Sequence, residues 1–131
     1  MSGINVVAVV VAALAAFVAS AVWYMVFGRE LAKVSAAFAK GLQQRQPWKL
    51  LGVLVQSLVL ALVLAYLLGL IGKIDWLGAL GIGVLLWVGL AAMQWVGSIM
   101  WENVPLKMAA IHAGDWLVKL VLIAVIIGVW R

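Results

Sequence analysis

The chain contains no cysteine, and only 10% of its 131 residues are charged. Without cysteine it can form no disulfide, no thiolate metal site and no cysteine nucleophile. A soluble globular domain carries about 25% charged residues, so this composition excludes an ordinary soluble domain. The sequence also holds a single histidine, which cannot form a metal site without partners. We therefore expect neither a metal nor a cofactor.

Long apolar runs fill most of the chain, which is 69% hydrophobic. About 20 apolar residues in a helix cross the roughly 30 Å hydrocarbon layer of a membrane. Four such runs cover residues 4–27, 48–70, 76–101 and 105–130. Because the apolar and polar residues do not alternate as in a strand, we expect helices. The sequence thus predicts an all-α integral membrane bundle of four transmembrane helices, forming a single domain over residues 1–131.

The borders of these runs carry helix-breaking residues, which supports the division. They are Gly28, Gln46-Pro47, Gly72 and Asn103-Val104-Pro105. Pro105 suits the first turn of the fourth helix, where a missing backbone N–H costs nothing.

The positive charge is concentrated between the first two runs. Residues 29–49 contain Arg29, Lys33, Lys40, Arg45 and Lys49 against one acid, Glu30. By the positive-inside rule this loop is cytoplasmic, so both termini are predicted to be non-cytoplasmic, together with Lys73 and Arg131. The net charge of +5 then reflects topology and contact with anionic lipid rather than nucleic-acid binding.

The basic loop has two interpretations that the sequence leaves open. Leu31, Val34, Phe38 and Leu42 recur at near-helical spacing, which is typical of an amphipathic helix lying in the membrane interface. Alternatively, residues 30–45 are a solvated basic segment that only sets topology.

A second alternative concerns the first run. Ala19-Ser20-Ala21 follows an apolar stretch and resembles a signal-peptidase site. The positively charged segment that opens a signal peptide is missing. We therefore expect a retained first helix.

Small residues recur along two of the predicted helices. Ala8, Ala12, Ala16 and Ser20 follow one another at four-residue steps, and Gly81, Gly89 and Gly97 form a looser row on the third helix. Such rows let helix backbones approach closely in a membrane. They predict helix packing, either within one chain or between copies of a homo-oligomer.

Ionisable residues are concentrated in the last predicted helix. His112, Asp115 and Lys119 are spaced by three and four residues, so they share one helical face, and Asp115 and Lys119 have ion-pair spacing. At 1.5 Å per residue, Asp115 lies about 15 Å from Pro105, in the middle of the membrane. A charge there costs about 2.5–3.5 kcal/mol, so we expect this face to be buried in protein.

The other helices place polar residues at a similar depth, roughly 10–12 Å from the cytoplasmic end. These are Ser20, Gln56, Ser57 and Gln94. They predict a shared polar layer, which is either a hydrated binding site or a set of interhelical hydrogen bonds that hold the bundle together. Glu102 and Lys107 fall at the inner interface, where water makes a charge inexpensive.

Two stretches resemble a known family. "VVAALAAFVASAVWYMVFG" (residues 10–28) and "WENVPLKMAAIHAG" (residues 101–114), with "IIGVW" near the end, resemble the small bacterial membrane proteins of domain of unknown function 1761. Its distinctive points here are Trp23-Tyr24, Phe27-Gly28, Glu102, Pro105, Lys107 and Gly114. The resemblance implies four membrane helices in a bacterial inner membrane and supplies no activity. Asp115 and Lys119 lie outside the stretches that carry it.

The buried polar face favours transport. We expect an oligomeric channel or transporter for protons, an ion or a small polar solute, with membrane lipid and further copies of the chain as partners. The alternative is a non-catalytic accessory or assembly subunit of a membrane complex. An enzyme is disfavoured, because Ser20, Ser57 and Ser98 have no evident triad partners and no phosphate-binding loop is present.

Overall fold

Four helices span the molecule in a computed structural model, which describes residues 4–43, 47–72 and 74–130. The spans are α1 (Val6–Val34), α3 (Pro47–Ile71), a composite of α4 (Trp76–Leu86), η1 (Trp87–Ala92) and α5 (Met93–Glu102), and α6 (Leu106–Val129). The short helix α2 (Ala36–Gln43) joins the first two spans. All four spans are long and apolar enough to cross a membrane. The predicted all-α architecture is confirmed, and the chain is a multi-pass membrane protein.

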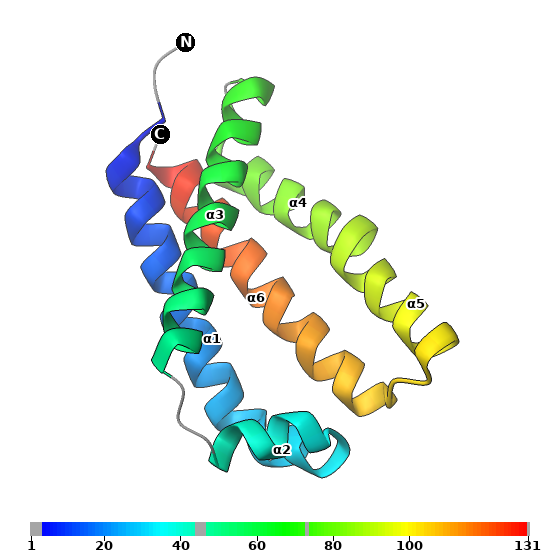
Figure 1. Cartoon of the computed structure of the whole chain (residues 1–131). Helices are drawn as coiled ribbons and strands as arrows, with labels where there is room; N and C mark the ends of the chain where they lie inside the picture. The colour runs from blue at the N-terminus through cyan, green and yellow to red at the C-terminus, as the bar shows by residue number, and fades with distance from the viewer. Residues whose placement is uncertain (1–3, 44–46, 73, 131) are drawn as a thin grey trace.

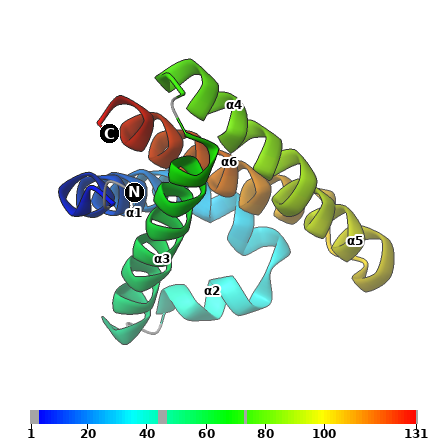
Figure 2. The ribbon, with the colours of Figure 1, turned by 90° about the horizontal axis from the view of Figure 1, so that it is seen from above.

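Helix α6 lies at the centre of the bundle (Figures 1 and 2). It contacts α1, α3, α4, η1 and α5, whereas α1 packs mainly on α6 and α3. Because other helices cover it on several sides, α6 buries both apolar and charged side chains along its length. The helix that carries charges at mid-membrane, α6, is therefore the one most shielded from lipid.

The two ends of the molecule differ. At one end the Asn5 side chain donates a hydrogen bond to the Trp130 carbonyl, at 3.1 Å, so both chain ends meet there. At the opposite end lie α2 and the connection between α5 and α6 (Figure 1). The basic loop and Lys107 thus share one end, as the sequence predicts. Of the charges that the topology argument used, Arg45, Lys73 and Arg131 lie outside the described residues.

Capping groups explain where several helices begin and end. The Asn5 side chain accepts from the Ala8 amide at 3.1 Å, and Asp75 accepts from the Gly78 amide at 2.8 Å. Gly72 has a φ of 98° just after α3. Asn103 adopts a left-handed conformation, φ 53°, after α5, which asparagine tolerates well. The predicted borders therefore lie within a residue or two of those observed, except at the end of α1.

Helix α1 continues well past residue 27, to Val34. Its 29 residues measure about 43 Å, longer than the roughly 30 Å hydrocarbon layer, so its charged final turns extend beyond the hydrocarbon. Ser35 ends it and opens α2, since the Ser35 hydroxyl accepts from the Phe38 amide at 3.2 Å. The basic loop is therefore largely helical, with a break at Ser35.

The third span contains a feature that the sequence does not indicate. Between α4 and α5 the six residues of η1 form a π-helix. A π turn is wider than an α turn and commonly occurs at functional sites. It also shifts the helical register, and accordingly α4 buries Ala79 and Gly83 whereas α5 buries no residue within the described chain.

The apolar core occupies the end of the bundle where the chain termini meet. It includes Ala12, Ala16, Leu64, Leu68 and Ile123, each at most 1% exposed. The buried polar residues among those described all lie on the α2 side of this cluster: Ser20, Ser57, Asp115 and Lys119. The apolar core therefore closes the polar region at the end where the chain termini meet. We call this core the apolar seal.

Small residues determine how closely the helices approach. Ala8, Ala12, Ala16 and Ser20 of the α1 row are all buried. In contrast, a Cβ built at Gly81, Gly89 or Gly97 would meet no atom within 4 Å. The close contacts of the third span instead involve Gly83, which faces the Leu120 carbonyl, and Ala79, which faces Gly128. The glycine row that the sequence singled out thus makes no close contact within the described chain.

Gly114 provides a test of this packing. A Cβ at Gly114 would lie 2.4 Å from the Trp23 ring, and that ring is fixed by its hydrogen bond to the Ile111 carbonyl. We expect Gly114→Ala to reduce the free energy of unfolding by about 1–3 kcal/mol through overpacking. Gly69→Ala on α3 is the matched control, because a Cβ there would meet no atom within 4 Å. Because its site is open, it should raise stability by up to about 1 kcal/mol through helix propensity. Thermal unfolding in detergent measures both, and equal effects would contradict the packing described.

Candidate functional site

An ion pair lies inside the bundle, on α6. Lys119 Nζ lies 3.0 Å from Asp115 Oδ2, and the two side chains are 7% and 3% exposed. The Lys119 ammonium also lies 4.3 Å from the centroid of the Trp116 ring, a favourable cation–π geometry. Both charges are therefore shielded from lipid by protein and neutralised by each other.

One oxygen of this pair is left without a partner. Asp115 Oδ1 is buried and accepts no hydrogen bond from the described residues, and the buried Ser57 hydroxyl on α3 likewise has no partner among them. The Tyr24 hydroxyl lies 2.7 Å from His112 Nδ1 and is also near enough to the Asp115 carboxylate to interact with it, although no hydrogen bond within 3.5 Å from the described residues reaches Asp115 Oδ1. A buried, unsatisfied charged acceptor is costly. The Asp115 carboxylate would therefore be stabilised by a hydrogen bond from a further donor.

Space for such a group lies beside the pair. A cavity of about 460 Å³ opens between α1, α2, α3 and α6. Its polar lining consists of Ser20, Tyr24, Gln56, Asp115 and Lys119, and much of the rest is aromatic, from Phe17, Phe38 and Trp116. At about 30 Å³ per water molecule, this volume would hold on the order of fifteen waters or one small solute. We call it the polar cavity.

The polar cavity gathers part of the predicted polar layer. Ser20, Gln56, Asp115 and Lys119 all line it, although they come from three different helices. The sequence alone does not place Tyr24 or Phe38 at this site. Tyr24 follows Ser20 by four residues and so shares its helical face, which is the signal that could have identified it. Phe38 could not have been found in this way, because its position depends on how α2 folds back: its ring centroid lies 6.0 Å from that of Tyr24.

His112 lies next to the cavity rather than in its lining. Its Nδ1 is 2.7 Å from the Tyr24 hydroxyl, and its ring stacks on Trp95 with centroids 5.0 Å apart and planes 11° apart. The hydroxyl donates this bond when Nδ1 is unprotonated. His112 thus links α1 and α5 to α6 and connects to the cavity through Tyr24.

Two tryptophans hold the segment of α6 that precedes the ion pair. Trp23 Nε1 donates to the Ile111 carbonyl at 2.9 Å, and Trp87 Nε1 donates to the Ala113 carbonyl at 2.7 Å. An indole N–H inside a membrane needs such an acceptor. Trp87 begins η1, so the π-helix supplies one of these two contacts.

The interfacial residues form a separate cluster at the α2 end. Glu30 pairs with Lys107 across α1 and α6, and with Lys33 at 3.2 Å on its own helix. All three side chains are well exposed, so these ion pairs contribute little to stability. Glu102 is also exposed. The Glu30–Lys107 pair marks the α2 end of the α1–α6 contact.

Gln94 does not join the polar cavity. It is exposed and lines a cleft of about 290 Å³ between α3 and the η1–α5 part of the third span. Trp116 lines both this cleft and the polar cavity and so lies between them. The predicted single layer is therefore divided in two by the Trp116 ring.

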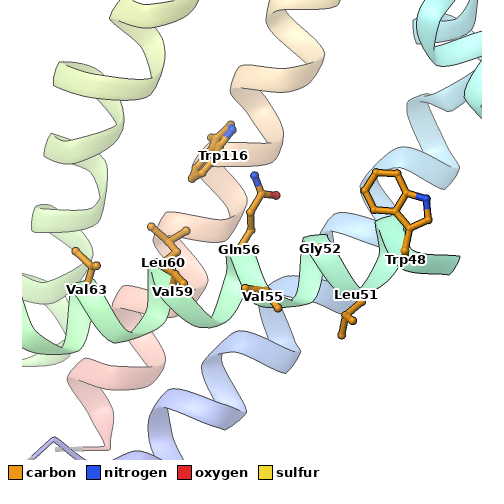
Figure 3. A pocket seen from close by; sticks show the side chains of 9 residues that line it. All are labelled: Trp48, Leu51, Gly52, Val55, Gln56, Val59, Leu60, Val63 and Trp116. Atoms are coloured by element: carbon orange, nitrogen blue, oxygen red, sulfur yellow. The ribbon is translucent and has the colours of Figure 1, made fainter. Parts of the chain in front are cut away.

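An apolar groove continues from the cleft along α3, as Figure 3 shows. Its volume is about 700 Å³, and its lining runs from Trp48 to Val63 on α3 with Trp116 on the facing helix. Gln56 lines the groove as well as the polar cavity, and in Figure 3 its side chain extends toward Trp116. It is the polar residue at the border of the two spaces.

Metal ligands do not cluster in the described residues, where no three His, Asp or Glu side chains come together. A family model gives the one comparison that matches. The model described as "Protein of unknown function (DUF1761)" covers residues 7–128. No curated protein and no solved structure matches the chain.

The buried ion pair can be tested by substituting its members singly and together. Asp115→Asn or Lys119→Met alone leaves one buried charge without its partner, and we expect each to reduce the free energy of unfolding by about 3–5 kcal/mol. The double variant removes both charges, so its stability should approach that of the unsubstituted protein. Reversible unfolding in mixed detergent measures the three variants. Additive losses in the double variant would show that the two charges do not depend on each other.

Proposed function

We propose that this chain, which belongs to the DUF1761 family of proteins of unknown function, is a transport protein. It binds a proton, an ion or a small polar solute in the polar cavity and passes it across the membrane as part of an oligomer. Its location is the bacterial inner membrane, with α2 on the cytoplasmic side. The observation that supports this most directly is the unpaired Asp115 oxygen beside a cavity.

A purely structural ion pair would account for this geometry less well. In many proteins a buried pair can be replaced by apolar side chains with little loss of stability, so such a pair is weak evidence for a stabilising role. Here one carboxylate oxygen accepts no hydrogen bond from the described residues, and the Asp115 residue lines a cavity with further polar groups. An ionisable residue in a membrane span that borders a hydrated space is by default a candidate for proton or ion movement.

Titratable groups are arranged in series along α6 from the α2 end inward. Glu30 pairs with Lys107, Tyr24 bonds to His112, and Asp115 pairs with Lys119. At helical rise, His112, Asp115 and Lys119 lie about 7.5, 12 and 18 Å along α6 from Lys107. A proton entering with water at the α2 end would therefore meet a relay of acceptors, with Asp115 as the binding group.

The apolar seal determines which movement of the helices transport would require. Beyond Lys119 the contact among α1, α3 and α6 consists of apolar side chains such as Ala12, Leu64 and Ile123. The seal closes the polar cavity at the end where the chain termini meet, so the proposed entry is from the α2 end. Transport requires the helices to separate at the seal, as in alternating access. The alternative function, a non-catalytic subunit of a larger complex, would need no such opening.

Flux through reconstituted protein tests the proposal. The double variant Asp115→Asn, Lys119→Met is expected to keep its fold and to lose pH-dependent proton flux in liposomes by tenfold or more. Glu102→Gln is the matched control, since it neutralises an exposed carboxylate outside the cavity, and its flux should be unchanged. A folded double variant with unaltered flux would exclude this role for the ion pair.

One-sided access can be measured separately, because the chain has no cysteine of its own. Ser20→Cys places a thiol in the polar cavity, and Ala12→Cys places one in the apolar seal. A small water-soluble thiol reagent should label position 20 at least tenfold faster from the α2 side, in inside-out vesicles, than from the other side. Position 12 should resist labelling from both. Equal labelling of position 20 from the two sides would contradict one-sided entry.

A further inference from the structure

Two carboxamides lie in the membrane part of the molecule without partners. Gln56 on α3 and Gln94 on α5 are exposed, and neither makes a hydrogen bond to any described residue. Gln56 lies nine residues after Pro47 and Gln94 eight residues before Glu102. At helical rise both are therefore about 12–14 Å from the α2 end of their helices, well inside the hydrocarbon layer.

The membrane-facing surroundings of these amides are mainly apolar, although Gln56 also lines the polar cavity. Gln94 borders the cleft between α3 and the third span, and Gln56 borders the groove that continues along α3. Leu60, Val63 and Trp116 line both spaces, so the two form one continuous depression between α3 and α5 with α6 at its base. Lipid chains filling this depression would offer the amides no hydrogen-bonding group, and an unsatisfied amide in hydrocarbon is unfavourable.

We infer that a second copy of this chain occupies the depression, with the Gln56 and Gln94 carboxamides of the two copies bonded to each other across a two-fold axis. A carboxamide carries both a donor and an acceptor, so the same residue on each copy can satisfy its counterpart. A two-fold interface is self-complementary in this way. This pairing places the contact between copies on the side of the chain that carries the depression between α3 and α5. It does not depend on the transport proposal.

The third span has the features that such an interface needs. Within the described chain α5 buries no residue, so the part of α5 that does not contact α6 is free to pack on a partner. Gly97 follows Gln94 by three residues and lies on the same side of α5. A Cβ at Gly97 would meet nothing within 4 Å, so a second backbone can approach there. The glycine row that makes no close contact within the described chain would thus pack between copies.

A second copy accounts for these features better than a bound lipid. A lipid chain would fill the groove volume but leave Gln56 and Gln94 unpaired. The second copy pairs both amides and needs no further component. It would also cover the flank where Gln56 borders the polar cavity, which separates that cavity from lipid.

Cross-linking in the full chain tests the interface. Leu90→Cys places a single thiol in the cleft beside Gln94, at a position 66% exposed. Val22→Cys is the control, 52% exposed on α1. In native membranes, oxidation and a short bis-maleimide should convert most of the Leu90→Cys protein to a covalent dimer and at most a tenth as much of the Val22→Cys protein.

The amides are tested in the Leu90→Cys background. Gln94→Leu combined with Gln56→Leu should lower the dimer yield at least tenfold, whereas Met93→Leu, a neighbouring exposed residue, should leave it unchanged. Unfolding temperatures of all variants confirm that each is folded. Equal dimer yields with Met93→Leu and with the double amide substitution would overturn the proposal. So would equal cross-linking at positions 22 and 90, or a native mass spectrum showing a monomer that retains lipid.

Discussion

The need to keep two opposite charges out of hydrocarbon governs how this bundle is built. Asp115 and Lys119 are four residues apart on α6 and are almost completely buried. A charge exposed to lipid at this depth would cost about 2.5–3.5 kcal/mol, so α6 is favoured at the position where most neighbours can cover it. The observed arrangement, with α1, α3 and the third span all contacting α6, meets this requirement. The same burial places the pair beside a cavity rather than beside lipid.

The contact between α1 and α6 joins the two ends of the sequence through three levels of interaction. Glu30 pairs with Lys107 at the α2 end, Tyr24 bonds to His112 above it, and Trp23 packs on Gly114 while donating to the Ile111 carbonyl. The stretches that carry the family resemblance, residues 10–28 and 101–114, thus meet in space. The first stretch lines the polar cavity through Ser20 and Tyr24, whereas the ion pair lies just beyond the second stretch.

The two ends of the bundle differ in the side chains that fill them. The apolar seal packs small and branched side chains at the end where the chain termini meet. The α2 side of this core is more aromatic and more polar, and it contains the cavity. The exposed face of α5 adds a third region, suited to contact with another copy.

Much of this architecture could be predicted from the sequence, because it follows from length and polarity. The four spans, their helical nature and the burial of Asp115 with Lys119 follow from the thickness of hydrocarbon and the cost of charge within it. The tertiary structure decided which polar residues share one space. Ser20 and Gln56 join the ion pair, whereas Gln94 is separated from it by Trp116.

Other features also lay beyond sequence reasoning. The π-helix of η1, the close contacts of Gly83, Gly114 and Gly128, and the position of Phe38 over Tyr24 depend on the angles and registers at which the helices meet. Hydrophobicity determines that a segment enters the membrane, but it is nearly uniform around these helices and so does not specify which face contacts which neighbour. Shape complementarity and a few hydrogen bonds specify that choice, and they exist only once the helices are assembled.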